Sequence, residues 1–314
     1  MAAALGAKIN ADGINMTMKG EKNIGLWLRK GTLNVANSTI VTADGPGLYT
    51  DGNALSEAAL DNTQLESGGF SAFQILGSAL NLNLSNGTVA TGGNGNVLEA
   101  LTLKDAQGAD ARNSQVNLMA DNATLNGNVI SDSVRNQVNL NLQNGSTLTG
   151  MMKNVSSTLL DSTSTWNMTG DSDLNTLQLD GKVLFDGQDF HTLTVNNNLS
   201  GSGYIGIHTR LDGDDSPSDR LNVKGDATGH FTVDITNQGG KGLRHTWVFR
   251  SLTWRGKRKM SPLHNHNPYW PGTMSTSSTR STAMNGTYSP AISPWSTPMH
   301  RLPRHPIVQR PVVT

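Results

Sequence analysis

The stretch "NQVNLNLQNGSTLTG", residues 136–150, decides the fold class of this chain. Val138, Leu140 and Leu142 alternate with polar residues, and this period of two puts one set of side chains on the inner face of a β-strand. Asn144-Gly145 then ends the run with two residues that tolerate positive φ and favour a tight turn. The stretch therefore predicts a short strand, a turn and a second short strand.

The same pattern covers most of the first 240 residues, and no segment has the 3.6-residue period of a helix. Further Asn-Gly and Asp-Gly pairs break the strands at Asn86-Gly87, Asn126-Gly127 and Asp180-Gly181. The chain is therefore expected to be all-β. The expected inward-facing residues are Leu125, Leu140, Leu142, Leu148, Leu177, Leu179 and Val183, continued by Leu193 and Val195.

The strands also repeat along the chain. "SQVNL" at 114–118 returns as "NQVNL" at 136–140, which is 22 positions on. Similar turns end at Gly127, Gly150 and Gly170, at intervals of 23 and 20. Such intervals are typical of a solenoid with about 20–24 residues per coil, which gives about eight or nine coils in the first 190 residues. A β-sandwich is the alternative, and it requires longer strands and less repetition.

Charge and composition divide the chain near residue 240. Residues 1–240 hold 13 of the 24 basic residues and all 24 acidic ones, so their net charge is 13 − 24 = −11. The remaining residues hold no acid and nine of the 11 prolines. The chain has no cysteine, which disfavours a redox or zinc protein, and no apolar run of the roughly 20 residues that span a membrane. The first residues, "MAAALGAKINADG", do not have the pattern of a signal peptide.

Residues 193–242, "LTVNNNLSGSGYIGIHTRLDGDDSPSDRLNVKGDATGHFTVDITNQGGKG", carry a family resemblance. An apolar strand is followed by a glycine-rich step at Gly201 and Gly203, and then by an aromatic-containing strand from Tyr204 to His208. The run Ser218 to Gly229 reads Ser-Asp-x-Leu-x-Val-x-Gly-x-Ala-x-Gly, and a last strand ends in Asn-x-Gly at Gly239. This order resembles the C-terminal part of a pertactin-like autotransporter passenger.

The resemblance implies a right-handed parallel β-helix exposed on a Gram-negative cell, at the outer membrane or secreted from it. It divides the chain into helix coils at 1–192, an autochaperone-like cap at 193–242 and an irregular tail at 243–314. Within the cap, Asp219 is expected to anchor a turn by accepting backbone N–H bonds. The intact gene is expected to encode a β-barrel translocator and an export signal, which this truncated chain lacks.

The tail from residue 243 onward has neither the period of two nor the final strands of the family. When the reading frame of residues 261–280 is displaced back by one base, it permits V-T-V-T-Q-P-Q-P-V-L-A-G-N-Y-V-Y-E-L-N-K. That sequence contains the family pattern V-x-A-G-x-Y-x-Y-x-L and regains strand-like alternation. The expectation is therefore an out-of-frame tail in a truncated gene product.

Other interpretations of the tail are a disordered proline-rich linker and a basic arm around "RGKRK" at 255–259. A nucleic-acid function is not expected, because the basic run lacks aromatic periodicity and a nucleic-acid-binding fold. His264 and His266 lack nearby cysteine or acidic partners for a metal.

Several acidic residues have a spacing that suits catalysis or metal binding, and each group also has a structural interpretation. The cluster Asp212, Asp214, Asp215 and Asp219 has the carboxylates that calcium requires, but the sequence fits a solvated turn better. Two acid pairs lie 22 positions apart, Glu99 with Asp121 and Asp110 with Asp132, and Arg112 and Arg135 accompany the second pair. Carboxylates on neighbouring coils would be expected in a β-helix enzyme. A repeat also brings similar surface residues back at its own period, so the sequence predicts no catalytic, cofactor-binding or metal-ligating residue.

Three functions remain open. The first is a non-catalytic passenger rod that serves adhesion or virulence, with host surface or matrix molecules as partners. The second is a β-helix polysaccharide lyase or hydrolase, which a cleft lined by carboxylates and arginine would favour. The third is a self-associating structural surface protein with ladders of Asn and Thr on a flat face.

Overall fold

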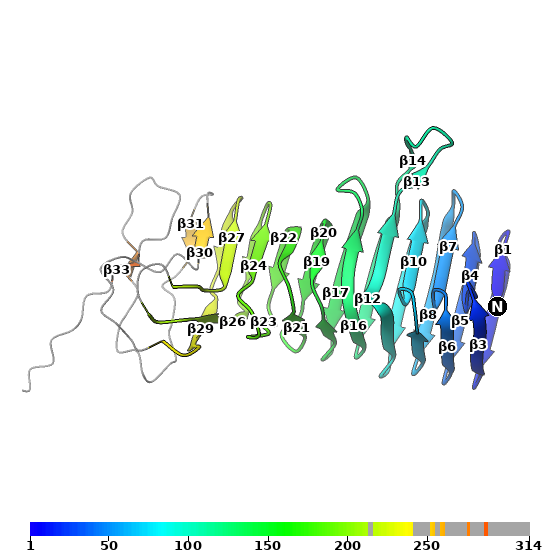
Figure 1. The fold of residues 1–314 in the computed structure, drawn as a ribbon, viewed down its shortest axis with the longest axis horizontal. Helices are drawn as coiled ribbons and strands as arrows, with labels where there is room; N and C mark the ends of the chain where they lie inside the picture. The colour runs from blue at the N-terminus through cyan, green and yellow to red at the C-terminus, as the bar shows by residue number, and fades with distance from the viewer. Residues whose placement is uncertain (213–215, 241–251, 255–257, 261–274, 277–285, 288–314) are drawn as a thin grey trace, which may run out of the picture.

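The computed structural model describes residues 1–212, 216–240, 252–254, 258–260, 275–276 and 286–287. These residues form strands, turns and bends, and no helix occurs among them. The strands stack into a rod whose blue N-terminal end and yellow later strands lie at opposite ends (Figure 1). The chain is thus a parallel β-solenoid, as expected from its repeats.

Each early coil contributes one strand to each of three faces of the rod, and each strand pairs in parallel with its counterpart on the next coil. Face 1 consists of β1 (Ala2–Ala4), β4 (Leu26–Arg29), β7 (Leu48–Asp51), β10 (Phe73–Leu76) and β19 (Met152–Lys153). Face 2 begins with β2 (Lys8–Asp12), β5 (Thr32–Ala36), β8 (Leu55–Asp61), β11 (Ala79–Ser85), β15 (Gln115–Asp121) and β17 (Gln137–Gln143). It continues with β20 (Val155–Leu160), β22 (Ser172–Leu179), β24 (Thr192–Val195), β25 (Leu199–Gly201), β27 (Arg220–Val223) and β28 (Ala227–Gly229).

Face 3 consists of β3 (Asn15–Glu21), β6 (Thr39–Asp44), β9 (Gln64–Ser67), β18 (Thr147–Thr149), β21 (Thr165–Met168), β23 (Lys182–Phe185), β26 (Tyr204–Thr209) and β29 (Thr232–Asn237). The long strands β12 (Val89–Leu101) and β16 (Thr124–Ser131) run across both face 3 and face 1, which joins these faces into one sheet. A hairpin of β13 (Leu103–Lys104) and β14 (Asp110–Arg112) projects from the side of the rod (Figure 1).

Coil length varies along the rod. Leu33 pairs with Ala58, which is 25 positions on, and Ala58 pairs with Leu82, which is 24 positions on. The next step, from Leu82 to Leu118, takes 36 positions because the hairpin β13–β14 is inserted in that coil. The predicted period of 22 holds for Leu118 and Leu140, and the following step from Leu140 to Thr158 takes 18. The expected range of 20–24 residues per coil is therefore too narrow.

The interior of the rod is a continuous stack of aliphatic side chains. All nine residues expected to face inward are at most 2% exposed: Leu125, Leu140, Leu142, Leu148, Leu177, Leu179, Val183, Leu193 and Val195. Aromatic side chains are rare in this core, and Phe73 and Trp166 are the largest fully buried ones. Burial of the apolar stack, at about 25 cal/mol per Å², is what holds the coils together.

Asparagines in the left-handed conformation form the corner between face 2 and face 3. Asn37, Asn62, Asn86, Asn122 and Asn144 have φ values between 44° and 56° at this corner. Asn86-Gly87 and Asn144-Gly145 are turns, as expected. The pair Asn126-Gly127 is instead part of β16, where the backbone passes from face 3 to face 1, so the turn expected there is wrong. A Cβ at Gly127 would lie 2.6 Å from the Val97 nitrogen, so glycine permits this close passage.

The solenoid continues across the boundary expected at residue 192. Ser172 pairs with Leu193, and Leu193 pairs with Leu221, so the expected cap is itself built of stacked coils. Two short strands, β30 (Leu252–Trp254) and β31 (Arg258–Met260), extend face 2 by pairing with β27 and β28. These six residues belong to the tail that was expected to be irregular, and the division of the chain at residues 192 and 242 stays a prediction. A separate antiparallel pair is formed by β32 (Ser275–Thr276) and β33 (Gly286–Thr287).

Most of the tail, including His264, His266 and most of the frame-displaced stretch at 261–280, lies outside the described residues. Within the described part of the chain, no helix is long and apolar enough to cross a membrane.

Candidate functional site

The two acid pairs that a coil-spanning enzyme would use are not formed. Glu99 lies on face 1, in register with Gln74 and Ile130. Asp121 lies on face 2, in register with Ser85 and Gln143. The 22-residue spacing does not bring them together, because the coil between β11 and β15 is lengthened by the inserted hairpin.

The two acids of the second pair bind different partners. Asp110 lies on the hairpin, where it forms ion pairs with Lys104 and with Arg135, whose Nη1 is 3.3 Å from Asp110 Oδ2. These two cations lower the pKa of the Asp110 carboxyl below its ordinary value, with the hydrogen bond from Lys104 as the main cause. Arg112 instead donates its Nε–H to the carbonyl of Gly77. Each of these charged groups therefore holds the hairpin in place.

Asp132 forms a polar junction at the base of the hairpin. Its Oδ2 accepts the backbone N–H of Thr102 at 2.9 Å, and its Oδ1 accepts the Thr102 hydroxyl at 2.9 Å. Asn136, which is only 1% exposed, donates to Asp132 Oδ1 at 2.8 Å and accepts the backbone N–H of Ser114. This network ties the two ends of the insertion, Thr102 and Ser114, to the next coil. Because both the NH2 and the carbonyl of the buried Asn136 amide have hydrogen-bond partners, the network favours a single conformation at the base of the hairpin.

The hairpin tip is fixed by its own hydrogen bonds. Asp105 Oδ1 accepts the N–H groups of Gln107 and Ala109 at 2.9 and 2.8 Å. The backbone N–H of Asp105 donates to the carbonyl of Ala109. The insertion is therefore a preformed projection, and sequence analysis missed it because its residues do not belong to the repeat.

The acidic cluster expected near residue 215 divides into separate environments. Asp214 and Asp215 lie outside the described residues. The backbone N–H of Asp212 donates to the Ser216 hydroxyl at 3.0 Å, at the surface. Asp219 is fully buried, with 0% of its surface exposed. Among the described residues no group of three or more His, Cys, Asp or Glu side chains is placed to hold a metal.

Asp219 joins two neighbouring coils in the cap. Its Oδ1 accepts the backbone N–H of His191 at 2.7 Å, and its Oδ2 accepts the backbone N–H of His208 at 2.7 Å. The same Oδ2 lies 3.1 Å from Nδ1 of the His208 ring. Charge-assisted bonds of this kind are the strongest hydrogen bonds in proteins. The predicted role of Asp219 as an acceptor of backbone N–H groups is confirmed by these contacts.

Face 1 carries a group of aromatic and charged side chains that sequence analysis did not single out. Trp27 is 38% exposed, and its Nε1–H donates to Asp51 Oδ1 at 3.0 Å. Arg29 donates its Nε–H to the same oxygen at 2.9 Å, and its guanidinium carbon lies 5.2 Å from the centre of the Trp27 ring. Tyr49 is the register partner of Trp27 on the next coil.

Arg29 and Asp51 in this group stabilise each other's charged forms. Burial acts to raise the pKa of Asp51, but hydrogen bonds from Arg29 and Trp27 outweigh it, so the pKa lies below its ordinary value. The pKa of Arg29 is raised, chiefly by its hydrogen bond to Asp51. Burial raises the pKa of Tyr49. All three groups therefore keep their ordinary charge states at neutral pH. The signal in the sequence was an aromatic residue at the outward position of "LWLR" and again of "LYTD", 22 positions on.

The same row of side chains continues to Glu99. Glu99 Oε2 accepts the Gln74 amide at 3.1 Å and the Ser71 hydroxyl at 3.3 Å. Its Oε1 accepts the amides of Asn94 and Asn96 at 3.0 and 2.7 Å. The carboxylate is thus the centre of a cluster of planar amide groups.

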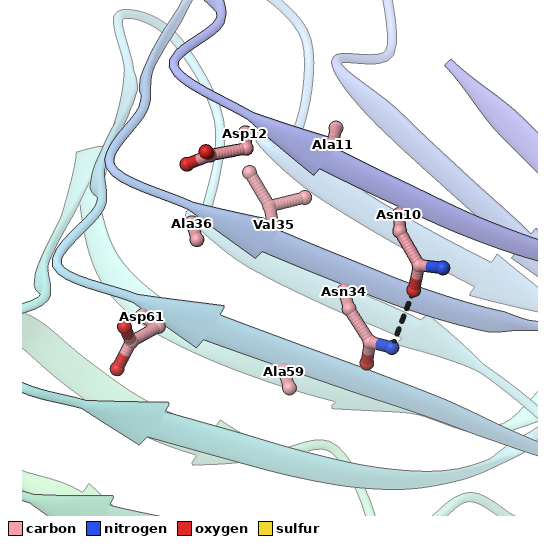
Figure 2. A pocket seen from close by; sticks show the side chains of 8 residues that line it. All are labelled: Asn10, Ala11, Asp12, Asn34, Val35, Ala36, Ala59 and Asp61. Atoms are coloured by element: carbon pink, nitrogen blue, oxygen red, sulfur yellow. Dashed lines mark hydrogen bonds between the residues drawn. The ribbon is translucent and has the colours of Figure 1, made fainter.

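Face 2 presents a ladder of asparagines and a shallow groove. Asn139 donates to Asn117 at 2.9 Å, and Asn117 donates to Asn81 at 3.0 Å. A separate link joins Asn34 to Asn10 at 2.8 Å, as Figure 2 shows. Beside this link the small outward residues Ala36 and Ala59 leave a groove of about 280 Å³. It is lined by Asn10, Ala11, Asp12, Asn34, Val35, Ala36, Ala59 and Asp61.

Comparison with known proteins gives a family-model match and three similar proteins. Residues 172–247 match the family model described as Autochaperone Domain Type 1. The chain is 27% identical to "Probable autotransporter YcgV" of Escherichia coli strain K12 over 282 residues, covering 68% of this chain and 29% of that protein. It is 44% identical to "Uncharacterized protein YdeU" of the same strain over 59 residues, covering 18% of this chain and 13% of that protein.

A further match is to "Adhesin BmaC autotransporter" of Brucella suis biovar 1 strain 1330. It is 40% identical over 65 residues and covers 20% of this chain and 2% of that protein. The chain spans less than a third of the length of each of these relatives. Together the matches support the sequence-based prediction of an autotransporter passenger region.

Proposed function

We propose that this autotransporter passenger region is a non-catalytic β-helical rod that serves adhesion at the surface of a Gram-negative cell. One observation carries the proposal. The outward side chains form continuous rows along a rod, whereas the acids that a coil-spanning enzyme would use are bound by structural partners. Asp110 pairs with Lys104 and Arg135, and Asp132 binds the backbone at Thr102. The similarity to "Adhesin BmaC autotransporter" of Brucella suis also supports the proposal.

The rod suits display for a physical reason. Parallel pairing with neighbouring coils satisfies the backbone along faces 2 and 3, so the interior strands of these faces have no free edge. The side chains on the faces, and the hairpin β13–β14, are then the groups that can contact host surface or matrix molecules. A solenoid distributes its stability over neighbouring coils, which lets surface residues change without loss of the scaffold.

Adhesion can be tested with purified protein. Latex beads coated with the full chain should bind to cultured epithelial cells, or to wells coated with collagen, fibronectin or laminin, several-fold more than beads coated with the heat-denatured chain. Equal binding of native and denatured beads to every surface would contradict the proposal. An assay for unsaturated products from pectate or alginate tests the lyase alternative, and activity there would overturn the non-catalytic part.

Self-association is a second candidate function, favoured by the rows of amides and hydroxyls. The Asn81, Asn117 and Asn139 ladder lies on face 2, and Thr124, Thr147 and Thr165 are in register on face 3. Matching rows on two rods could exchange hydrogen bonds along their length. Sedimentation velocity over a 100-fold range of protein concentration should then show reversible growth of oligomers, and a constant sedimentation coefficient would contradict this function.

A further inference from the structure

We infer that the row Trp27, Tyr49, Gln74 and Glu99 on face 1 is a binding surface for a neutral glycan chain that lies along the axis of the rod. This inference rests on the proposed adhesive function and names the class of molecule that one face recognises. Four observations carry it: the register of the row, the rigidity of Trp27, the change from aromatic to polar side chains along the row, and the balance of charge.

The four side chains form a straight row. Trp27 pairs with Tyr49, Tyr49 with Gln74, and Gln74 with Glu99 on successive coils. Their neighbours along each strand are buried, so these residues point outward. Parallel strands are about 4.8 Å apart, so the row presents one side chain per step over about 14 Å. That step is comparable to the length of one sugar ring in an extended chain.

The side chain of Trp27 is fixed in an exposed orientation before any ligand binds. Its indole N–H is fixed by Asp51, and Arg29 lies 5.2 Å from its ring centre. On the preceding coil its register partner is Ala2, whose methyl group is too short to cover an indole. This leaves 38% of Trp27 exposed in a chain where aromatic residues are only 5% of the total. A ring that is already fixed loses little conformational entropy on binding.

The row combines the two kinds of contact that a sugar needs. Aromatic rings stack against the apolar C–H face of a pyranose, and Trp27 and Tyr49 provide two rings on adjacent coils. Planar amides and carboxylates exchange hydrogen bonds with hydroxyl groups. Gln74 places such a group next to Tyr49, and Glu99 follows on the next coil, where hydrogen bonds from Gln74 and Asn96 orient its carboxylate.

Charge and shape favour a neutral glycan over other partners. Arg29 is paired with Asp51, so this row offers no unpaired cation to an acidic polymer. The strands of the row are paired on both sides, which excludes the addition of a peptide strand. A stable protein interface buries about 800 Å² on each partner around an apolar centre, whereas this row becomes polar after two rings.

The test uses the full chain and fluorescently labelled glucose, mannose, galactose and N-acetylglucosamine oligomers of one to six units, with heparin as an acidic comparison. Fluorescence polarisation should detect binding of at least one neutral series, with affinity rising with length up to about four units. Trp27→Ala and Tyr49→Ala should each weaken that binding at least tenfold, and Trp27→Phe should retain part of it. Met119→Ala, on face 2 and equally exposed at 38%, is the matched control and should bind as the unmodified chain does.

Thermal unfolding of each variant separates lost binding from lost folding. The inference is overturned if no neutral oligomer binds, if only heparin binds, or if folded Trp27→Ala binds normally. The bead assay distinguishes the two levels of the argument. Adhesion that persists in Trp27→Ala, with no saccharide binding by any variant, refutes the glycan surface and leaves the adhesive function standing, whereas beads of the unmodified chain that fail to adhere refute the function itself.

Discussion

The first coils and the coils between β17 and β22 enclose the same kind of apolar interior with coils of different length. Between β5 and β11 a coil takes 24 or 25 residues and has a strand on each of three faces. Between β17 and β22 it takes 18 or 19, because face 1 is reduced to the two residues of β19 in the first of these coils and has no described strand in the second. The comparison shows that the stacking of the coils is maintained by strand pairing on faces 2 and 3. The strands of face 1 can be shortened without interrupting that stacking.

Trp166 shows how the narrow coils close their interior. It is fully buried on β21, and its indole N–H donates to the Gly150 carbonyl at 2.8 Å. Gly150 lies just before β19, where face 1 ends. The indole therefore packs in the interior and is bonded to the chain next to the end of face 1. In the wide coils Phe73 has the largest buried side chain, and it lies on face 1 itself.

Replacement of these two aromatic residues tests the comparison most strongly. Trp166→Ala should cost about 3–5 kcal/mol of unfolding free energy, and Phe73→Ala should cost less within the same range. The difference arises because Trp166→Ala also removes the donor of the Gly150 carbonyl. Urea unfolding measures the cost, and hydrogen exchange should place the loss in the adjacent coils. A larger cost at Phe73 would contradict the role of the indole in closing the narrow coils.

The cap gives the next largest effect. Asp219→Ala should cost about 2–4 kcal/mol, because the backbone N–H groups of His191 and His208 lose their acceptor while the cost of burying a charge is also removed. Hydrogen exchange should show faster exchange at these two amides and in β26 and β27. Asp212→Ala, at the surface, is the control and should leave both amides protected. Unchanged protection in Asp219→Ala would refute its anchoring role.

The narrow coils and the cap should lose stability at opposite ends of the pH range, the narrow coils through Asp161 and the cap through Tyr204. Burial acts to raise the pKa of Asp161, but hydrogen bonds from Asn144, Ser164 and Thr163 outweigh it and lower the pKa from 3.8 to about 2. The stabilisation is therefore complete above pH 3.8 and is lost as the pH falls toward 2. Local exchange at the Asn144 turn should increase in that window, and in Asp161→Asn this acid dependence should be absent.

Tyr204 affects stability at alkaline pH. Burial, with the hydrogen bond to Asp234, raises its pKa from 10.0 to about 12. Its neutral form is favoured in the folded state, so its contribution is present below pH 10 and is lost as the pH rises toward 12. Tyr204→Phe should remove this alkaline dependence from the exchange of β26 and β29. A dependence that is unchanged in the variant would show that another group causes it.

The smallest effect is expected on the surface ladder. Asn139→Ala removes bonds to Asn117 and Ser157 and should cost about 0.5–1 kcal/mol. Asn34→Ala, in the wide coils, removes the bond to Asn10 and should cost less. Urea midpoints measured in parallel compare them. A cost at Asn34 that equals or exceeds the cost at Asn139 would show that the ladder does not add stability through its continuity.

The alternation of residues was enough to predict the interior, because a buried solenoid strand must place every second side chain inward. Leu140 and Leu179 follow this rule: both are buried, and the residues on either side of them are more exposed. The acceptor role of Asp219 was also predictable, because Asp side chains next to turn residues commonly accept backbone N–H bonds. These features depend on local sequence, which is fully visible in the printed chain.

Features that depend on coil length were not predictable. The spacing of "SQVNL" and "NQVNL" measures one coil, and the hairpin makes the preceding coil 36 residues long. The supposed partners Glu99 and Asp121 therefore lie on different faces. The row of Trp27 and Tyr49 was missed for a related reason, since two exposed aromatic residues become neighbours only when the register of their coils is known.

The hairpin β13–β14 makes the rod a scaffold for grafting. Leu82 and Leu118 remain register partners although 36 positions separate them. The pairing of the coils is therefore kept despite the insertion between Thr102 and Ser114, whose two ends are hydrogen-bonded to the next coil. Each doubling of loop length adds only about 0.6 kcal/mol of closure entropy. A foreign epitope or enzyme-recognition peptide can therefore replace the tip at residues 105–109 and be carried at a fixed point on the side of a rigid carrier.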